Sequence, residues 1–360
     1  MTNIITSQQI RQRLEENHLA YALMPLQNDT FIIISERGGR VFGPFLNAES
    51  ESIFWVNEAF ATPESFRDWL ASGDWNMGGE RMWIAPETQY LVQDRSDFWG
   101  TIQIPAQMDP GVQFLSADGQ GGWNLSQNLV LDAYNFATGQ KQLRVDKRFT
   151  PVADPLRNLS VYADLGKDVL FAGYQQTVDL CESRQDEILS ESWNLVQLRP
   201  GGQLLIPTTP QPEYTDYYAP IDAAHLAVDS QGMRLKVTGQ TQYKIGIQAA
   251  QTFGRLGYLN QLADGRAYLI VRSFFNNPSA VYAEEFADQP LRRGRSMHIY
   301  NDDGGLGGFG ELEVNGQTIG GTSGRSATSD QFVLWFYLGD PGPIKKVASL
   351  LLGMSTDKET

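Results

Sequence analysis

The stretch SMHIYNDDGGLGGFGELEVNGQTIGG, residues 296–321, decides the fold because at first sight it fits two kinds of ligand loop as well as a plain strand. Its glycines follow the pattern G-x-G-x-x-G of a dinucleotide loop, and its acidic residues suggest a calcium loop. A dinucleotide loop needs a helix after the glycines, because the helix N-terminus holds the pyrophosphate. Residues 311–321 instead alternate polar and apolar side chains and end in Gly-Gly. This pattern predicts a strand and a turn, so no dinucleotide cofactor is expected.

The acidic residues of the same stretch do not follow the spacing of a calcium loop. An EF-hand loop places oxygen ligands at positions 1, 3 and 5 and a glutamate at position 12. Counting back from Glu313 places Gly304 at position 3, and counting back from Glu311 gives no better match. An irregular ion site at Asp302 and Asp303 stays open as the weaker alternative. The simpler expectation is a wide glycine loop between two strands, without metal.

Two carboxylates in this stretch are predicted to share one face of a strand. Side chains at positions i and i+2 of a strand point the same way, so Glu311 and Glu313 lie opposite Leu312 and Val314, with their Cα atoms about 6.5 Å apart. A strand with one solvated face explains this pattern most simply. The alternative is a polar site, because a glutamate has no packing reason to lie on an enclosed sheet face.

The rest of the chain is rich in strand patterns. Short helices are expected over residues 6–18 and 62–71, and the tail PIKKVASLLLGM fits a strand or a short helix. We expect one large antiparallel β domain over residues 26–360, with residues 1–25 as a helical segment packed on it. Long apolar or alternating runs predict strands at residues 29–35, 233–240, 265–275 and 330–340.

Composition and charge argue against several classes of partner. The 360 residues carry a formal charge of −14, which repels the phosphates of nucleic acids and anionic membranes. A single cysteine, Cys181, leaves no disulfide framework and no thiolate metal cluster. No apolar run reaches the ~18 residues of a membrane span, and the first residues lack the apolar core of a secretory signal. A cytoplasmic protein is therefore expected.

Seven segments follow one another in a characteristic order: ERGGRVFGPF (36–45), WNMGGERMWIAPE (75–87), SESWNLVQLRPGGQLLIPT (190–208), YKIGIQ (243–248), LGYLN (256–260), YLIVRSFF (268–275) and GELEVNG (310–316). In this order they resemble the aldose 1-epimerase, or galactose mutarotase-like, superfamily, in an uncharacterised bacterial branch. The resemblance implies a β-supersandwich whose concave sheet face binds a sugar or glycan, in a monomer or homodimer.

The same resemblance implies roles for particular residues. Mutarotation needs one group to take the proton of the anomeric hydroxyl and another to protonate the ring oxygen. Glu313, in a Leu-Glu context late in the chain, matches the family's base, and Glu311 beside it would raise its pKa by like-charge repulsion. Arg81 matches the basic sugar-binding position after the early strands, and Glu87 is a weaker match.

The chain departs from the superfamily at its catalytic histidines. The segment that holds the family's general acid reads LSESWNL here, with Ser190 near the histidine position and Glu191 beside it. Glu191 is therefore the candidate acid, with its pKa raised by burial. Of the three histidines, only His298 leads into the acidic loop and is a candidate for lining the site; His18 and His225 are expected to be structural.

Aromatic residues support a carbohydrate site. Six of the eight tryptophans lie between residues 55 and 123 among polar neighbours, which suits stacking on sugar rings, although core packing explains any one of them. Trp83 and Trp193 are expected nearest the pocket, with Lys244 as a further cation. An enzyme predicts that Arg81, Glu191 and Glu313 converge on one pocket. The alternatives are a non-catalytic sugar-binding protein and an assembly module with its sheet face covered.

Overall fold

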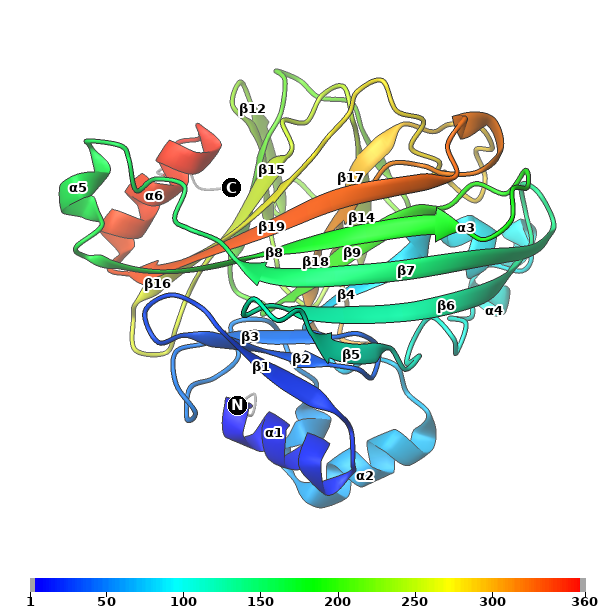
Figure 1. Cartoon of the computed structure of the whole chain (residues 1–360). Coiled ribbons are helices and arrows are strands. Elements are labelled where there is room, and N and C mark those ends of the chain that lie inside the picture. Colours follow the sequence, from blue (N-terminus) through cyan, green and yellow to red (C-terminus); the bar gives the residue numbers. More distant parts are fainter. Residues whose placement is uncertain (1–3, 357–360) are drawn as a thin grey trace.

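The computed structural model describes residues 4–356 and consists mainly of two large antiparallel sheets (Figure 1). One sheet has nine strands in the order β1-β2-β3-β4-β9-β18-β17-β14-β11. The other has ten strands in the order β12-β13-β10-β15-β16-β19-β8-β7-β6-β5. The predicted fold class, large antiparallel sheets with a few short helices, is confirmed.

The strands of the nine-stranded sheet are β1 (Tyr21–Pro25), β2 (Phe31–Ser35), β3 (Val41–Phe45), β4 (Glu80–Ala85), β9 (Glu191–Leu198), β18 (Gly310–Asn315), β17 (Arg295–Asn301), β14 (Tyr243–Gln248) and β11 (Tyr214–Asp216). Those of the ten-stranded sheet are β12 (Leu226–Asp229), β13 (Gly232–Lys236), β10 (Gln203–Pro207), β15 (Arg255–Gln261), β16 (Ala267–Phe274), β19 (Ala327–Gly339), β8 (Val169–Glu182), β7 (Gly139–Pro151), β6 (Trp123–Ala133) and β5 (Phe114–Ala117). Each of the four strands predicted from apolar or alternating runs is present, as β2, β13, β16 and β19.

The helices are short and begin where the sequence places their caps. The Thr6 side chain accepts from the backbone N–H of Gln9 at the start of α1, and the Thr62 side chain does the same for Ser65 at the start of α2. The tail that fitted either a strand or a helix forms α6, because its apolar residues recur at helical spacing and face the ten-stranded sheet. The helices are α1 (Ser7–Glu16), α2 (Pro63–Ser72), α3 (Glu87–Tyr90), α4 (Phe98–Thr101), α5 (Tyr162–Leu165) and α6 (Pro341–Leu352), and short 3₁₀ turns span Glu58–Ala61, Arg95–Asp97 and Gly321–Ser323.

The main core lies between the two sheets. Leu312 of β18 pairs with Val196 of β9 and Ile299 of β17, and all three are fully buried against apolar residues of the other sheet. Strand β2 is buried on both faces, as its continuous β-branched run predicted. Ile32 and Ile34 join the main core, while Ile33 packs under α1 and α2.

The N-terminal helices lie beside β1, β2 and β3 at one end of the molecule, and α6 covers part of the ten-stranded sheet at another (Figure 1). Strand β1 begins at Tyr21, so the nine-stranded sheet starts within the predicted helical segment 1–25. The division of the chain near residue 25 stays a prediction. Within residues 4–356 no helix is long and apolar enough to cross a membrane.

Candidate functional site

Strand register places the predicted site residues on one face of the nine-stranded sheet. Directly paired residues of antiparallel strands point to the same side. In β4, β9 and β18, Arg81 pairs with Leu195, and Leu195 pairs with Glu313. Glu313 pairs in turn with His298 of β17. This row of side chains crosses four strands on the face opposite Leu312 and Val314.

The same logic places the remaining predicted residues. Trp83 pairs with Trp193, and Glu311 pairs with Tyr300, which pairs with Lys244 of β14. Because residues two apart share a face, Glu311 lies on the side of Glu313, and Glu191 lies on the side of Trp193. Glu87 joins this face from α3, directly after β4.

A cavity of about 540 Å³ lies over this face. It is lined by seven of the nine predicted site residues: Arg81, Trp83, Glu87, Trp193, Lys244, Glu311 and Glu313. The other lining residues are Gly73, Trp75, Leu91, Trp99, Ile102, Gln103, Ile104, Ala106, Asp109, Pro110, Leu195, Tyr218, Gln242, Tyr300, Leu306 and Phe309. The cavity is therefore mainly aromatic and apolar, with a few charged groups at its floor, as is typical of small-molecule sites.

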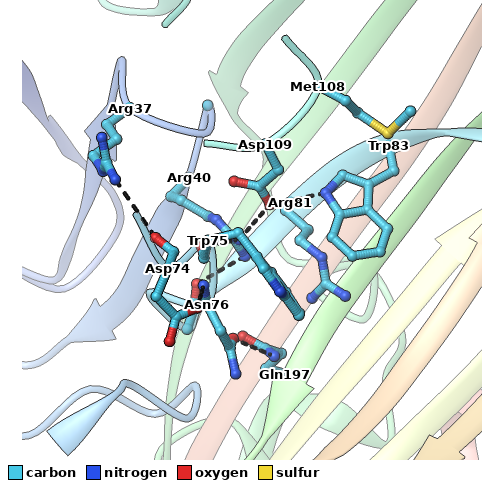
Figure 2. Close-up of polar contacts among 12 residues, drawn as sticks. Arg37, Arg40, Asp74, Trp75, Asn76, Arg81, Trp83, Met108, Asp109 and Gln197 are labelled. Carbon is cyan, nitrogen blue, oxygen red and sulfur yellow. Dashed lines mark hydrogen bonds and ion pairs between the residues drawn. The ribbon is translucent and has the colours of Figure 1, made fainter. Parts of the chain in front are cut away.

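Arg81 is held between a carboxylate and two indole rings. Its Nη1 lies 2.6 Å from Glu311 Oε1, and both side chains are almost fully buried. The guanidinium carbon lies 4.1 Å from the ring centre of Trp83 and 5.0 Å from that of Trp75, and Figure 2 shows the three side chains together. Cation–π contact and a buried ion pair therefore both fix the position of the guanidinium.

Further polar contacts hold Trp75 and Trp83, the two tryptophans beside Arg81. Trp83 donates from Nε1 to Asp109 Oδ2 at 2.8 Å, and Arg40 Nη2 lies 2.5 Å from the same oxygen (Figure 2). Arg40 also donates to the backbone carbonyl of Trp75 at 2.9 Å. Burial lowers the pKa of Arg40 to about 10 and raises the pKa of Asp109, although each group opposes the shift of the other. Arg40 and Asp109 thus hold Trp75 and Trp83 in position.

Lys244 lies between two carboxylates at the floor of the cavity. Its Nζ lies 2.9 Å from Glu87 Oε2, 3.8 Å from Glu313 Oε2 and 4.7 Å from the ring centre of Trp193. Burial by itself disfavours the ammonium form, but the carboxylates of Glu313 and Glu87 outweigh it and hold the pKa of Lys244 well above its ordinary value. Lys244 is therefore a cation in the resting protein.

Glu313 is the carboxyl group of the cavity whose proton affinity is most clearly changed. Its side chain is 1% exposed, and its Oε2 accepts a hydrogen bond from Trp193 Nε1 at 3.0 Å. Burial raises the pKa of Glu313 to about 7; Lys244 opposes this shift, while Glu311 and Glu87 add to it. A group with this pKa exchanges protons readily near neutral pH.

Glu191 does not line the cavity, so it does not converge there with Arg81 and Glu313. It pairs with Ala85 at the end of β4, and its carboxylate accepts from Asn315 Nδ2 at 2.9 Å, from Thr318 Oγ1 at 2.5 Å and from the backbone N–H of Ala283. These partners come from segments far along the chain and enclose the group completely. Burial raises the pKa of Glu191 to about 7.

His298 shares the face of Glu313 but lies beneath other side chains. Its ring packs edge-on against that of Tyr217 at 5.6 Å, and it is 1% exposed. Burial lowers the pKa of His298 well below its ordinary value, and the nearby cations Lys244 and Arg295 add to this. The imidazole is therefore neutral and is not among the groups that line the cavity.

The glycine loop positions apolar residues of the cavity. Asp302 accepts from the backbone N–H groups of Gly304 at 2.9 Å, Leu306 at 3.1 Å and Gly308 at 2.8 Å. These bonds use the oxygens that an ion would need, and they set the loop so that Leu306 and Phe309 reach the cavity. In the described part of the chain, no group of three or more His, Cys, Asp and Glu side chains could hold a metal ion.

Sequence reasoning missed several residues of the cavity. Trp75 lies in the motif segment WNMGGERMW, so its place beside Arg81 had a signal in the sequence. Trp99 belonged to the tryptophan-rich region, whereas Tyr218 and Gln242 carried no local signal. They reach the cavity from the segment before β12 and the segment before β14, which only the folded chain brings opposite residues 99–110.

Comparison with solved structures finds similarity to the aldose 1-epimerase and galactose mutarotase group. A protein provisionally assigned as an aldose 1-epimerase of Escherichia coli K12 is 11% identical with a TM-score of 0.49, covering 89% of this chain and 99% of its own. A galactose mutarotase-like protein of Lactobacillus casei is 10% identical with a TM-score of 0.47, covering 89% and 100%. No function is carried over from these proteins at such identities and TM-scores.

Comparison of sequences gives a family but no activity. No curated protein matches the sequence significantly. The model of the family of unknown function DUF6786 matches residues 8–359, which is nearly the whole chain. The protein therefore belongs to the DUF6786 family.

Proposed function

We propose that the cavity binds an uncharged saccharide and that Glu313 and Lys244 exchange protons with it in a reaction of the aldose 1-epimerase type. One observation carries this proposal: a carboxyl group with a pKa near 7 lies 3.8 Å from an ammonium group at the floor of an aromatic cavity. Acid and base catalysis on one small substrate needs such a pair within reach of the same molecule.

The charges of the cavity support a neutral ligand. Both cations that line it already have carboxylate partners, since Arg81 binds Glu311 and Lys244 binds Glu87. With Glu313 added, the carboxylates exceed the cations, so a phosphate or uronate group would find no free positive charge. Hydroxyl groups, in contrast, donate to carboxylates and accept from ammonium and guanidinium groups, while indole rings cover the apolar face of a sugar ring.

The proposed reaction opens and recloses a pyranose ring. Glu313 accepts the proton of the anomeric hydroxyl while Lys244 donates a proton to the ring oxygen, and the bond between C1 and that oxygen breaks to give an open-chain aldehyde. Rotation about C1–C2 and the reverse transfers then close the other anomer and return both protons. Lys244 becomes a stronger acid during the first step, because a protonated Glu313 no longer stabilises the ammonium form.

Lys244 takes the role that the sequence suggested for Glu191. Glu191 is enclosed by Asn315 and Thr318 and has no place among the groups that line the cavity. Lys244 lies on the floor beside Glu313 and carries a proton at neutral pH. The role of general acid is therefore proposed for Lys244.

The test is anomer exchange followed by NMR on a panel of freshly dissolved aldoses. Glu313→Gln keeps the shape of the side chain but cannot accept a proton, so its exchange rate should fall about 10²–10⁴-fold. Glu64→Gln, at an exposed site on α2, is the matched control and should behave as wild type. Equal rates for wild type and Glu313→Gln, no faster than buffer, would reject the reaction.

A sugar-binding protein without catalysis is the second candidate. It is favoured by one observation: none of the described residues that line the cavity is a histidine, so the acid must be a strongly held ammonium group. Tryptophan fluorescence should then change on addition of sugars, because four indoles line the cavity, while anomer exchange stays at the buffer rate. Absence of both signals would reject the two candidates together.

A further inference from the structure

The mouth of the cavity differs in chemistry from its floor. All charged side chains near Glu313 lie deep in the cavity and are buried. Another part of the cavity lining is an aromatic rim, defined here as Trp99, Tyr218 and Tyr300, which runs from the exposed indole of Trp99 to the buried ring of Tyr300 and carries no charge. Because Tyr300 pairs directly with Lys244 across β14 and β17, the rim is continuous with the floor.

The rings of the rim form a connected and partly open surface. The ring centres of Trp99 and Tyr218 lie 5.1 Å apart, and those of Tyr218 and Tyr300 lie 6.4 Å apart. Trp99 is 58% exposed, although it lines a cavity and contacts other aromatic rings. An indole left open at the mouth of a binding cavity is available to a ligand.

Local hydrogen bonds hold Trp99 in place. It lies in the short helix α4, where Asp97 Oδ1 accepts the backbone N–H of Gly100 at 3.2 Å. The hydroxyl of Thr101 donates to the backbone carbonyl of Asp97 at 2.8 Å, and Ile102 pairs with Val92 just after the helix. These bonds fix the backbone that carries Trp99, and the indole itself packs against the rings of Phe98 at 5.0 Å and Tyr218 at 5.1 Å, which lowers the entropic cost of stacking a ligand on it.

The cavity is larger than one sugar ring requires. A hexose has about twelve heavy atoms. If each atom takes as much space as one molecule takes in liquid water, about 30 Å³, the sugar needs roughly 360 Å³. The cavity measures about 540 Å³. The cavity therefore has room beyond one ring at Glu313, and its lining includes the rim.

We propose that the aromatic rim is a second sugar subsite, so that the ligand is a reducing disaccharide or a longer glycan. This inference rests on the proposed function: the reducing-end ring lies at Glu313, and the next ring stacks on Trp99. A sugar ring fits the rim better than an alkyl chain does, because the exposed amides of Gln103 and Gln242 flank the rings and bond hydroxyl groups. An anion is not favoured, since the rim carries no cation.

The test compares affinities by titration calorimetry for glucose and galactose against maltose, cellobiose and lactose. In the wild type, at least one disaccharide should bind about tenfold more tightly than its reducing-end monosaccharide, as expected for one added stacking contact. In Trp99→Ala this ratio should collapse towards one, while Trp99→Tyr should keep most of it. Phe253→Ala removes an aromatic side chain of similar exposure away from the cavity and should leave the ratio unchanged.

The outcomes separate this inference from the proposed function. Equal affinities for monosaccharides and disaccharides in the wild type would overturn the second subsite alone, if monosaccharides still bind or exchange their anomers. A ratio that survives in Trp99→Ala would also overturn it. If no sugar of the panel binds and no exchange is accelerated, the proposed function and the subsite fall together.

Discussion

The buried ion pair between Arg81 and Glu311 gives the sharpest stability prediction. The two groups lie 2.6 Å apart, with side chains only 2% and 6% exposed. In Arg81→Met the carboxylate of Glu311 stays buried and loses its partner, while the methionine fills part of the space between the rings of Trp75 and Trp83. The protein should therefore unfold more easily, mainly because an unpaired charge remains in a site with little access to water.

The expected loss can be worked from these contacts. Breaking a buried ion pair by removing one partner costs about 3–5 kcal/mol. Loss of the cation–π contacts of Arg81 adds about 1 kcal/mol, which the sulfur and methylene contacts of methionine offset in part. The free energy of unfolding should fall by about 4 kcal/mol.

Urea unfolding followed by circular dichroism measures this loss. Arg67→Met is the matched control, because Arg67 pairs with Glu64 at 3.3 Å where both side chains are more than 60% exposed, and it should cost less than about 0.5 kcal/mol. The double variant Arg81→Met/Glu311→Gln buries no charge at this pair and should recover about half of the loss. Equal losses for Arg81→Met and Arg67→Met would refute the reasoning, as would a double variant no more stable than the single one.

Three further predictions follow from individual groups. The anomer-exchange rate should rise about tenfold per pH unit up to about pH 7 and then level off, because only ionised Glu313 accepts the proton. A rate that does not change between pH 5 and pH 8 would contradict this role of Glu313. Burial lowers the pKa of Lys147 from 10.5 to about 7. Between pH 7 and pH 10.5 the unfolded chain therefore binds more protons than the folded chain, and the free energy of unfolding rises with pH. Lys147→Met should remove about 1.4 kcal/mol of that rise per pH unit, and parallel slopes in urea titrations of the two proteins would disprove it. Asp302→Ala should lower the free energy of unfolding by about 2 kcal/mol, because the loop N–H groups of Gly304 and Gly308 lose their hydrogen bonds to the carboxylate. Asp303→Ala loses one exposed hydrogen bond and should lower the free energy of unfolding much less in the same urea titrations.

Much of the fold could be predicted because strand patterns are local. A strand points alternate residues to opposite sides, so the sequence GELEVN by itself predicts that Glu311 and Glu313 lie opposite Leu312 and Val314. The structure confirms this arrangement, since Leu312 pairs with Val196 and Ile299 in the core. The alternating polar and apolar residues after the glycines likewise predicted a strand there, and the structure has β18 at this position.

Which polar residues reach the cavity could not be predicted in the same way. Glu191, His298 and Glu313 lie on one face of one sheet, yet only Glu313 lines the cavity. Glu191 is covered by partners that include Ala283 and Thr318, and His298 lies beneath Tyr217. These covering residues come from loops distant in sequence, and no periodicity within β9 or β17 contains information about them.

The sequence alone thus determined the all-β architecture and the side of each strand on which the acidic and aromatic residues lie, because both depend on a two-residue period that neighbours in the chain impose. Tertiary structure alone decided which of those side chains share a cavity and which are enclosed. It also decided the ionic pairing of Arg81 with Glu311 and of Lys244 with Glu87, as well as the pKa of Glu313. Burial and charge–charge interaction depend on distances between segments up to 230 residues apart, and only the packed chain sets those distances.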